Sequence, residues 1–173
     1  AASHEALGDR ALAVSGLSPS FPGREYQEAV RLAKQIGVEL RTGETDELGD
    51  PAYNRNPHDR CFHCKTHLFT ILRRIADEEG LSAVLDGSNA DDTGDYRPGM
   101  DAARSLGVKS PLMEAGLTKD EIRLLLKERD LDVWDKPAQA CLASRIPYRQ
   151  EITEERLNRI ARAEGTLLDM GYR

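Results

Sequence analysis

The sequence predicts an α/β protein built on a doubly wound parallel sheet with helices on both faces. Short apolar segments alternate along the 173 residues with longer segments in which apolar side chains recur every three or four positions. The short segments are typical of buried strands and the longer ones of amphipathic helices. This alternation favours a parallel sheet, because parallel strands need long crossover connections. Ligands of such sheets bind at the carboxyl ends of the strands, so the loops that follow the strands are the places to look for a site.

The first strand, helix and second strand are predicted within the first quarter of the chain. Residues 11–14 read as a short buried strand, and residues 15–20 as a loop rich in Ser, Gly and Pro. Pro22 opens a helical pattern, and Gly37 closes it because glycine favours the left-handed conformation that ends many helices. Residues 38–42 read as the second strand.

The longest helix is predicted in the middle of the chain. Residues 46–60 are polar and contain glycine and prolines, which indicates a loop with little regular structure. Residues 61–79 have apolar positions at helical spacing, and Gly80 ends the pattern. Residues 82–86 read as the third strand.

The remaining elements are mostly helical. Residues 99–106 predict a short helix, and residues 108–112 a fourth strand. Thr118 and Glu121 have the spacing of a capping box, which predicts a helix that starts there. Residues 153–170 predict the last helix.

The chain is expected to divide into an α/β domain, residues 1–150, and the start of a carboxyl-terminal helical or substrate-binding region, residues 151–173. Residues 3–7 read as the tail of a helix that precedes the first strand, and the chain stops just past a helix. We therefore expect a doubly wound fold that is truncated at both ends.

Charge and composition argue against several classes of protein. The net charge is −6 with a pI near 5.3, and basic residues are mixed with acids, as in residues 73–79. A nucleic-acid binder needs a basic stripe, so no nucleic-acid partner is expected. Apolar runs are too short for a membrane span, and residues 1–10 lack the layout of a signal peptide. Together with three cysteines, an odd number, this favours a reducing cytoplasm.

The three cysteines are the most informative residues. Cys61 and Cys64 form a Cys-x-x-C clip at a predicted helix start, and Cys141 lies 77 residues beyond Cys64. Three thiols suit a [4Fe–4S] cluster with one iron that lacks a protein thiolate, or a zinc site completed by a histidine. Three histidines lie near the clip, His58, His63 and His67. The alternatives are small buried residues at a helix start or, with less support, a redox dithiol.

The loop at residues 86–95 is a candidate for binding Mg²⁺ with phosphates. Asn89, Asp91, Asp92 and Asp95 offer hard oxygen ligands directly after an apolar strand. The alternative is a turn in which the Asn and Asp side chains cap backbone groups.

Cys141 stands between Lys136 and Arg145. Two cations close to this thiol would favour the thiolate and activate the sulfur. Arg145 could equally hold a carboxylate or phosphate through two hydrogen bonds. The alternative is a structural loop with an inert cysteine.

Further motifs extend over nearly the whole chain. They are Asp-Arg-Cys-Phe-His-Cys-Lys at 59–65, Gly-Ser-Asn-Ala-Asp-Asp at 87–92, Asp-Tyr-Arg-Pro-Gly at 95–99, Ser-Pro-Leu at 110–112, Ala-Gly-Leu-Thr-Lys at 115–119, Trp-Asp-Lys-Pro-Ala at 134–138 and Ala-Cys-Leu-Ala-Ser-Arg-Ile-Pro-Tyr at 140–148. Together they resemble the sacrificial sulfur transferases of the LarE type, in the PP-loop ATP pyrophosphatase superfamily. The resemblance implies the fold of the adenine nucleotide alpha hydrolases.

The resemblance also implies a reaction. Such enzymes use ATP and Mg²⁺ to adenylylate a carboxylate of pyridinium-3,5-biscarboxylic acid mononucleotide, releasing pyrophosphate. A sulfur atom then attacks the acyl-adenylate, and the thiocarboxylates formed are ligands of the nickel pincer cofactor of lactate racemase. In one branch the sulfur comes from the protein's own cysteine, which becomes dehydroalanine. In another, three cysteines hold a [4Fe–4S] cluster with an extra sulfide on its open iron. The family tends to form homo-oligomers.

Carried over to this sequence, the resemblance assigns roles to single residues. Cys141 matches the sulfur-donating cysteine and Arg145 an arginine of the active site, while Glu164 matches a glutamate there on spacing alone. Cys61 and Cys64 match the additional pair of the cluster-type members. Lys136, from the same motifs, joins Cys141, Arg145 and Glu164 as a candidate catalytic residue.

Two loops are expected to bind the nucleotide. The loop from Ser15 to Ser18 falls where the superfamily holds adenosine, and the segment after residue 86 falls where it meets nucleotide and metal. The candidate residues of that second segment are Gly87, Asn89, Asp91, Asp92 and Arg97.

One feature of the superfamily is absent from the sequence. Its phosphate loop, Ser-Gly-Gly-x-Asp-Ser, would lie just before Ala1, and the basic residues expected after the last helix are also missing. Either the ends of the sequence are missing or the enzyme is broken, and the intact remaining motifs favour missing ends. The pair Cys61 and Cys64 favours a cluster-type sulfur transferase. Three alternatives stay open: the same reaction with Cys141 as a single-use donor, a tRNA thiolase of the same superfamily, and a non-catalytic zinc-binding module.

Overall fold

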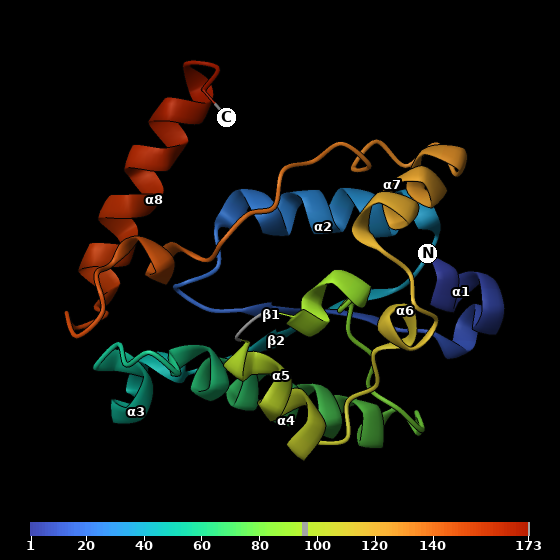
Figure 1. The fold of residues 1–173 in the computed structure, drawn as a ribbon, viewed down its shortest axis with the longest axis horizontal. Helices are drawn as coiled ribbons and strands as arrows, with labels where there is room; N and C mark the ends of the chain where they lie inside the picture. Colours follow the sequence, from blue (N-terminus) through green and yellow to red (C-terminus); the bar gives the residue numbers. More distant parts are fainter. Residues whose placement is uncertain (95–96, 173) are drawn as a thin grey trace.

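Two parallel strands, β1 (Ala13–Leu17) and β2 (Leu40–Glu44), form the sheet of this computed structural model, which describes residues 1–94 and 97–172. Helix α2 (Gly23–Ile36) contacts β1, helix α4 (Arg60–Glu78) contacts β2, and the two helices lie on opposite sides of the strands (Figure 1). The predicted α/β class and the parallel pairing are therefore confirmed.

The sheet is smaller than predicted. The segments expected as the third and fourth strands make only an isolated parallel bridge, between Leu85 and Lys109. Pro111 has no N–H for a strand ladder and starts the short helix α6 (Pro111–Glu114), so the fourth segment cannot continue as a strand. Within the described residues, the extended sheet is thus limited to β1 and β2.

The loop predicted at residues 15–20 was wrong in its first half, because β1 extends through Ser15 to Leu17. Gly16, which suggested a turn, pairs with Gly43 of β2. A methyl group on Gly16 would collide with Leu68 of α4, and one on Gly43 would lie 2.7 Å from Cγ2 of Ile71. The paired glycines therefore serve the close approach of α4 to the sheet, which is a known use of glycine within strands.

The helices follow the predictions to within a few residues. Helix α2 ends at Gly37, whose φ of 81° is left-handed and whose N–H bonds the carbonyl of Ala33. Thr118 and Glu121 form the predicted capping box of α7. The remaining predicted helices are α1 (Ala2–Leu7), α5 (Pro98–Ser105), α7 (Lys119–Glu128) and α8 (Glu154–Asp169).

The loop predicted at residues 46–60 contains regular structure. A 3-10 turn, η2 (Glu47–Gly49), is followed by the short helix α3 (Pro51–Asn54). Pro51 occupies the first turn of α3, where its missing N–H has no partner to lose, and the Asp50 side chain caps the helix by accepting from Ala52 N at 2.8 Å. Three further 3-10 turns are η1 (Gly8–Arg10), η3 (Ala90–Gly94) and η4 (Leu142–Arg145).

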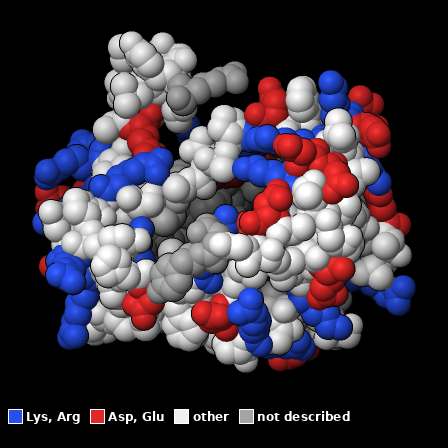
Figure 2. Space-filling view, viewed as in Figure 1, with Lys and Arg blue, Asp and Glu red and all other residues white. Residues whose placement is uncertain are grey.

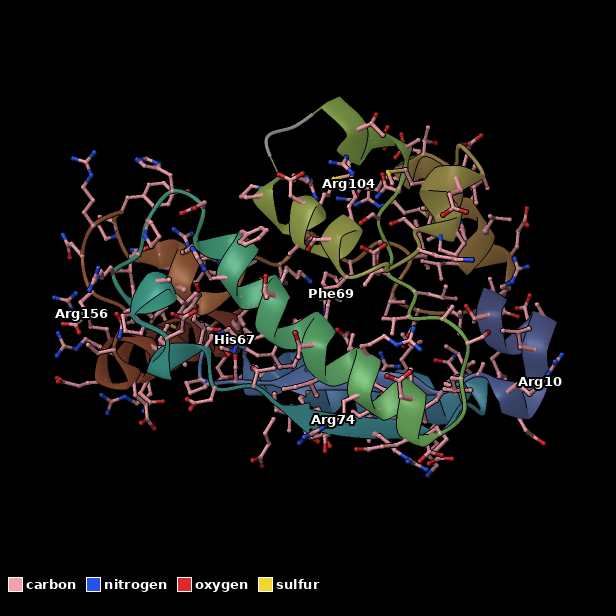
Figure 3. The ribbon with its side chains drawn as sticks, turned by 90° about the horizontal axis from the view of Figure 1, so that it is seen from below. Arg10, His67, Phe69, Arg74, Arg104 and Arg156 are labelled. Carbon is pink, nitrogen blue, oxygen red and sulfur yellow. The ribbon has the colours of Figure 1, made fainter. Side chains whose placement is uncertain are left out.

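Two clusters of buried apolar side chains make the interior. The helix-pair core lies between α4 and α5, where Phe69 is on the side of α4 that faces α5 (Figure 3). Its buried members are Phe69, Ala76, Val84, Ala102 and Ala103. The cysteine-side core joins α3, η4 and the start of α8, and its buried members are Tyr53, Leu142, Ala143, Ile146, Ile152 and Leu157.

The last helix is anchored at its beginning. Helix α8 contacts η4, and from there it extends away from the sheet (Figure 1). Leu157 is fully buried in the cysteine-side core, whereas Leu167 and Met170 near the other end are exposed. No helix among the described residues is both long and apolar enough to cross a membrane.

Candidate functional site

The carboxyl ends of β1 and β2 lead into a buried polar cluster. Ser20 follows β1, and Thr45 and Glu47 follow β2. Glu47 is 1% exposed, and its carboxylate accepts hydrogen bonds from Ser20 Oγ at 2.8 Å and Thr45 Oγ1 at 2.6 Å. Leu142 N donates to the carbonyl of Ser20 at 3.0 Å, which brings the segment after Cys141 to the same edge of the sheet.

The three cysteines gather at this edge. Cys61 and Cys64 lie on the first turns of α4, and Cys141 directly precedes η4. All three are free thiols, exposed at Cys61 and Cys141 and half-buried at Cys64. The charge of an ionised Cys141 contributes to raising the pKa of both Cys61 and Cys64. Cys141 is therefore close enough to both thiols of the clip to influence their protonation.

The two thiols of the clip have different surroundings. Burial raises the pKa of Cys61, and the charges of Arg60 and Lys65 oppose that shift in part. Burial, assisted by the nearby Glu47 carboxylate, raises the pKa of Cys64 from 9.0 to about 12. Cys64 therefore stays protonated at neutral pH unless a metal ion or another cation replaces the proton.

Tyr53 completes the cluster and was missed by the sequence analysis. Its side chain is 1% exposed, and its hydroxyl makes no hydrogen bond within the described part of the chain. Burial raises the pKa of Tyr53, with further contributions from Cys64 and Cys141, whereas the Ser20 hydroxyl acts in the opposite sense. The available signal was Pro51, which marked a helix start in a segment that we predicted as a loop.

A thiol donor set fits an iron–sulfur cluster. A buried hydroxyl beside such a cluster, such as that of Tyr53, can donate to a sulfur ligand. Each histidine near the clip has another partner. His67 Nε2 is 3.1 Å from Asp50 Oδ2, His63 Nε2 is 3.8 Å from Asp59 Oδ2, and the His58 ring stacks on a tyrosine. Among the described residues, no group of three or more His, Cys, Asp or Glu side chains is already arranged to hold a metal ion.

Two of the predicted catalytic residues meet. Arg145 of η4 donates from Nε to Glu164 Oε1 of α8 at 2.6 Å. Arg145 Nη1 also donates to Ser144 Oγ at 2.7 Å, and Ser144 Oγ donates to the carbonyl of Cys141 at 2.7 Å. The guanidinium group is thus connected through Ser144 to the main chain of Cys141.

Lys136 pairs with two carboxylates of α2. Its Nζ contacts Glu25 Oε2 at 2.7 Å and also Glu28, both on α2. Burial opposes its charge, but the hydrogen bonds to these two carboxylates outweigh that effect and raise the pKa of Lys136. Arg31, also on α2, pairs with Asp132 at 2.7 Å. The segment that leads from Asp132 to Cys141 is therefore held along α2.

The expected nucleotide loop is held by local hydrogen bonds. Asp92 Oδ2 accepts from Asn89 N at 3.0 Å, and Asn89 Oδ1 accepts from Asp91 N at 3.0 Å. Asp91 Oδ2 accepts from Lys119 N at 2.8 Å at the start of α7, and Arg97 pairs with Asp92 at 2.8 Å. The three bonds to backbone N–H groups are the capping that we gave as the alternative to a magnesium site.

The other predicted nucleotide residues lie in or after strand β1 and after the bridge at Leu85. Ser15 lies within β1, Ser18 follows it and hydrogen-bonds Ser20, and Gly87 has open space beside its Cα. Asp95 lies outside the described residues. Figure 2 shows acidic and basic side chains interspersed over the face that it draws, which is hollowed near its centre.

Comparison with known proteins gives three relatives. The chain is 43% identical over 98% of its length to an uncharacterized protein of Synechocystis. It is 33% identical over 95% of its length to the pyridinium-3,5-bisthiocarboxylic acid mononucleotide synthase of Lactiplantibacillus plantarum, and 29% identical over 85% to an uncharacterized protein of Methanocaldococcus jannaschii. No family model matches the chain.

The chain spans 63%, 59% and 56% of the lengths of these three relatives, so each of them is considerably longer than the part that it shares. The similarity nevertheless includes both cysteine-bearing segments, because it extends over nearly the whole chain. The chain therefore resembles a LarE-type sulfur transferase over 95% of its length, through its similarity to a pyridinium-3,5-bisthiocarboxylic acid mononucleotide synthase.

Proposed function

We propose that this chain acts as an ATP-dependent sulfur transferase of the PP-loop superfamily. The substrate would be a carboxylate of pyridinium-3,5-biscarboxylic acid mononucleotide, and the product a thiocarboxylate for a nickel pincer cofactor. The single observation that carries the proposal is that Cys64 and the residue after Cys141 pack in one core at the carboxyl ends of two parallel strands, in a chain that resembles a bisthiocarboxylic acid mononucleotide synthase.

Activation by ATP follows from the chemistry of such a product. A carboxylate oxygen is a poor leaving group, so its replacement by sulfur needs prior activation. Transfer of AMP from ATP to the carboxylate releases pyrophosphate and gives an acyl-adenylate. A sulfur nucleophile then forms the C–S bond, and the oxygen leaves with AMP.

Arg145 is the residue best suited to hold the substrate near Cys141. Its side chain is 40% exposed, and its partner Glu164 is 28% exposed, so a ligand carboxylate or phosphate can reach the guanidinium group. Arginine binds such anions through two parallel hydrogen bonds. Glu164 would orient the guanidinium group in the free protein and compete with the ligand for it.

Cys61, Cys64 and Cys141 would hold a [4Fe–4S] cluster, which when bound supplies an iron without a protein thiolate and hence a position for exchangeable sulfide. The chain provides two features for this role. The positive charges of Arg60 and Lys65 lie beside Cys61, and the buried Tyr53 hydroxyl lies near Cys64 and Cys141. Both would stabilise negative charge on sulfur.

The same geometry supports a second reaction, in which Cys141 itself is the sulfur donor. Its side chain is exposed at the edge of the site. The C–S bond of Cys141 would then break after the thioester forms, leaving dehydroalanine in the chain.

ATP and Mg²⁺ are assigned in either case to Ser18 and the segment 87–92, where a metal would take over carboxylate oxygens that now bond backbone N–H groups.

The test is anaerobic purification followed by turnover with ATP, Mg²⁺, sulfide and the biscarboxylate substrate. We expect iron and sulfide in equal amounts, release of pyrophosphate, repeated turnover and an unchanged protein mass. Cys61→Ala is expected to lose the iron, whereas Thr66→Ala, further along α4, is the matched control and should retain it. Zinc without iron would refute the cluster, and loss of H₂S from Cys141 would support the single-use reaction. Absence of pyrophosphate release would refute activation by this chain alone, whose residues 1–173 do not include the phosphate loop of the superfamily.

A further inference from the structure

One buried side chain connects the two cysteine-bearing segments. Asn56 is 0% exposed and has a left-handed backbone with φ of 56°, which Asn tolerates better than most residues. Its Nδ2 donates to the carbonyls of Ile146 at 3.1 Å and Pro147 at 2.9 Å. Its Oδ1 accepts from Arg60 Nη1 at 2.9 Å.

These partners use the full polarity of the amide. Two carbonyl oxygens need donors and Arg60 needs an acceptor, so an Asn amide satisfies all three, whereas an Asp carboxylate can serve only the arginine. The backbone of Asn56 adds a further bond, because its carbonyl accepts from Arg149 N at 3.0 Å.

Aromatic stacking reinforces the same junction. The guanidinium group of Arg60 lies over the ring of Tyr148 at 4.7 Å, and the rings of His58 and Tyr148 are 4.2 Å apart. Arg60 directly precedes Cys61, and Tyr148 belongs to the segment after Cys141. The junction therefore lies next to the clip on one side and a few residues from Cys141 on the other.

We propose that Asn56 is a positioning residue whose amide fixes the segment of Cys141 against the start of α4, so that the three thiols come together. The segment 146–149 has no helix or strand of its own, and Asn56 supplies hydrogen bonds that such structure would otherwise provide. The use of the three thiols for sulfur transfer rests on the proposed function, but the positioning itself does not.

The test measures how close Cys61 and Cys141 are, in the full chain with Cys64→Ser as the parent so that only these two thiols remain. The probe is dibromobimane, a short reagent that becomes fluorescent when both of its ends have reacted. In Asn56→Asp we expect cross-linking to fall roughly fivefold or more, as the loss of buried hydrogen bonds implies. Labelling of each thiol by a monofunctional maleimide is expected to remain as in the parent.

Asn54→Ala is the matched control. Asn54 lies in the same turn, but its side chain donates to Leu48 O at 3.3 Å and not to the Cys141 segment, so cross-linking should stay at the parent level. Asn56→Gly is the second variant, since glycine retains the left-handed backbone and removes the amide. Unfolding by urea is used to compare all proteins at the same folded fraction.

Three outcomes would overturn the proposal. They are equal cross-linking in folded Asn56→Asp and the parent, an equal loss in Asn54→Ala, and no cross-link in the parent. Failure of both Asn56 variants to fold would also overturn it, because the amide would then be required for folding rather than for positioning. The assay needs neither ATP nor metal, so an inactive protein that cross-links as expected would refute the proposed function alone.

Discussion

The helix-pair core and the cysteine-side core lie on either side of α4 and differ in polar content. Both cores are formed by apolar side chains, and the buried members of the helix-pair core come chiefly from α4 and α5. Two buried polar residues, Asp92 and Ser110, lie in the loops that follow Val84 of the helix-pair core. The cysteine-side core adjoins four buried polar residues, Ser20, Glu47, Asn56 and Arg60. Because a buried polar group destabilises a protein unless it is hydrogen-bonded, such a concentration indicates a region shaped by function as well as by stability.

The first turns of α4 take part in both regions. Phe62 packs against the helix-pair core, and Cys64 packs against the cysteine-side core. The first core fixes where α4 lies, and the second depends on that position for its thiols. Substitutions in each core should separate these two contributions.

The largest expected effect comes from emptying either core. Phe69→Ala should lower the free energy of unfolding by about 3–5 kcal/mol and Leu157→Ala by about 2–5 kcal/mol, because each leaves a cavity. Only Leu157→Ala should also change the alkylation rate of Cys141, since Leu157 packs in the same core as Leu142. Urea unfolding and mass spectrometry of alkylated protein measure the two quantities. Equal changes in alkylation would show that the two cores are not separable.

A smaller effect is expected where α4 approaches the sheet. Gly43→Ala should cost about 1–3 kcal/mol, because the added methyl group meets Cγ2 of Ile71, an atom close to the helix backbone. Gly16→Ala should cost less, because it meets the end of the Leu68 side chain, which can rotate. Gly23→Ala, with no atom within 4 Å, is the control in the same unfolding assay. A larger loss in Gly16→Ala than in Gly43→Ala would contradict this account.

The cysteine-side core should also make stability depend on alkaline pH. Burial raises the pKa of Cys64 from 9.0 to about 12, so between these values the native state keeps a proton that the unfolded state releases. The free energy of unfolding should therefore fall as pH rises above about 9, by no more than about 1.4 kcal/mol per pH unit for this group. Cys64→Ser should give a shallower slope in urea unfolding between pH 8 and 10. An unchanged slope would assign the dependence to other groups.

The smallest effect is expected in α7, which has no buried residue. Thr118→Ala removes an N-terminal cap and should cost about 1 kcal/mol. Alkylation of all three cysteines should remain unchanged, since α7 belongs to neither core. Thr166→Ala, at an exposed position of α8 where the hydroxyl bonds only the carbonyl of Arg162, serves as the control for loss of a threonine.

The elements with local signals were predictable. Gly37 and the pair Thr118 and Glu121 marked helix ends through their own backbone and capping preferences, and the structure has both. Gly16 misled the prediction because its reason lies in α4, a long-range contact that no local pattern records. Pro51 was taken for a breaker although it starts a helix, and Pro111 ends the bridge that was expected to become a strand.

The site was predictable where a residue type has few alternatives. Three thiols are rare enough to be singled out by count, and Arg145 and Glu164, which the structure joins, followed from a resemblance. Tyr53, Glu47 and Asn56 were not found, because their importance depends on burial beside the cysteines. Lys136 was selected for its closeness to Cys141 in sequence, whereas in space its partners lie on α2.

The hydrogen bond between Leu142 N and the carbonyl of Ser20 limits how far Cys141 can travel. Leu142 is 3% exposed, and the Cα of Cys141 stays about 3.8 Å from that fixed residue. The preceding residues 137–140 are exposed, but Lys136 restrains them at the other end. The sulfur cannot work as a swinging arm that visits distant partners. Any molecule that reacts with this exposed sulfur must therefore come to the edge of the sheet, because the sulfur cannot leave it.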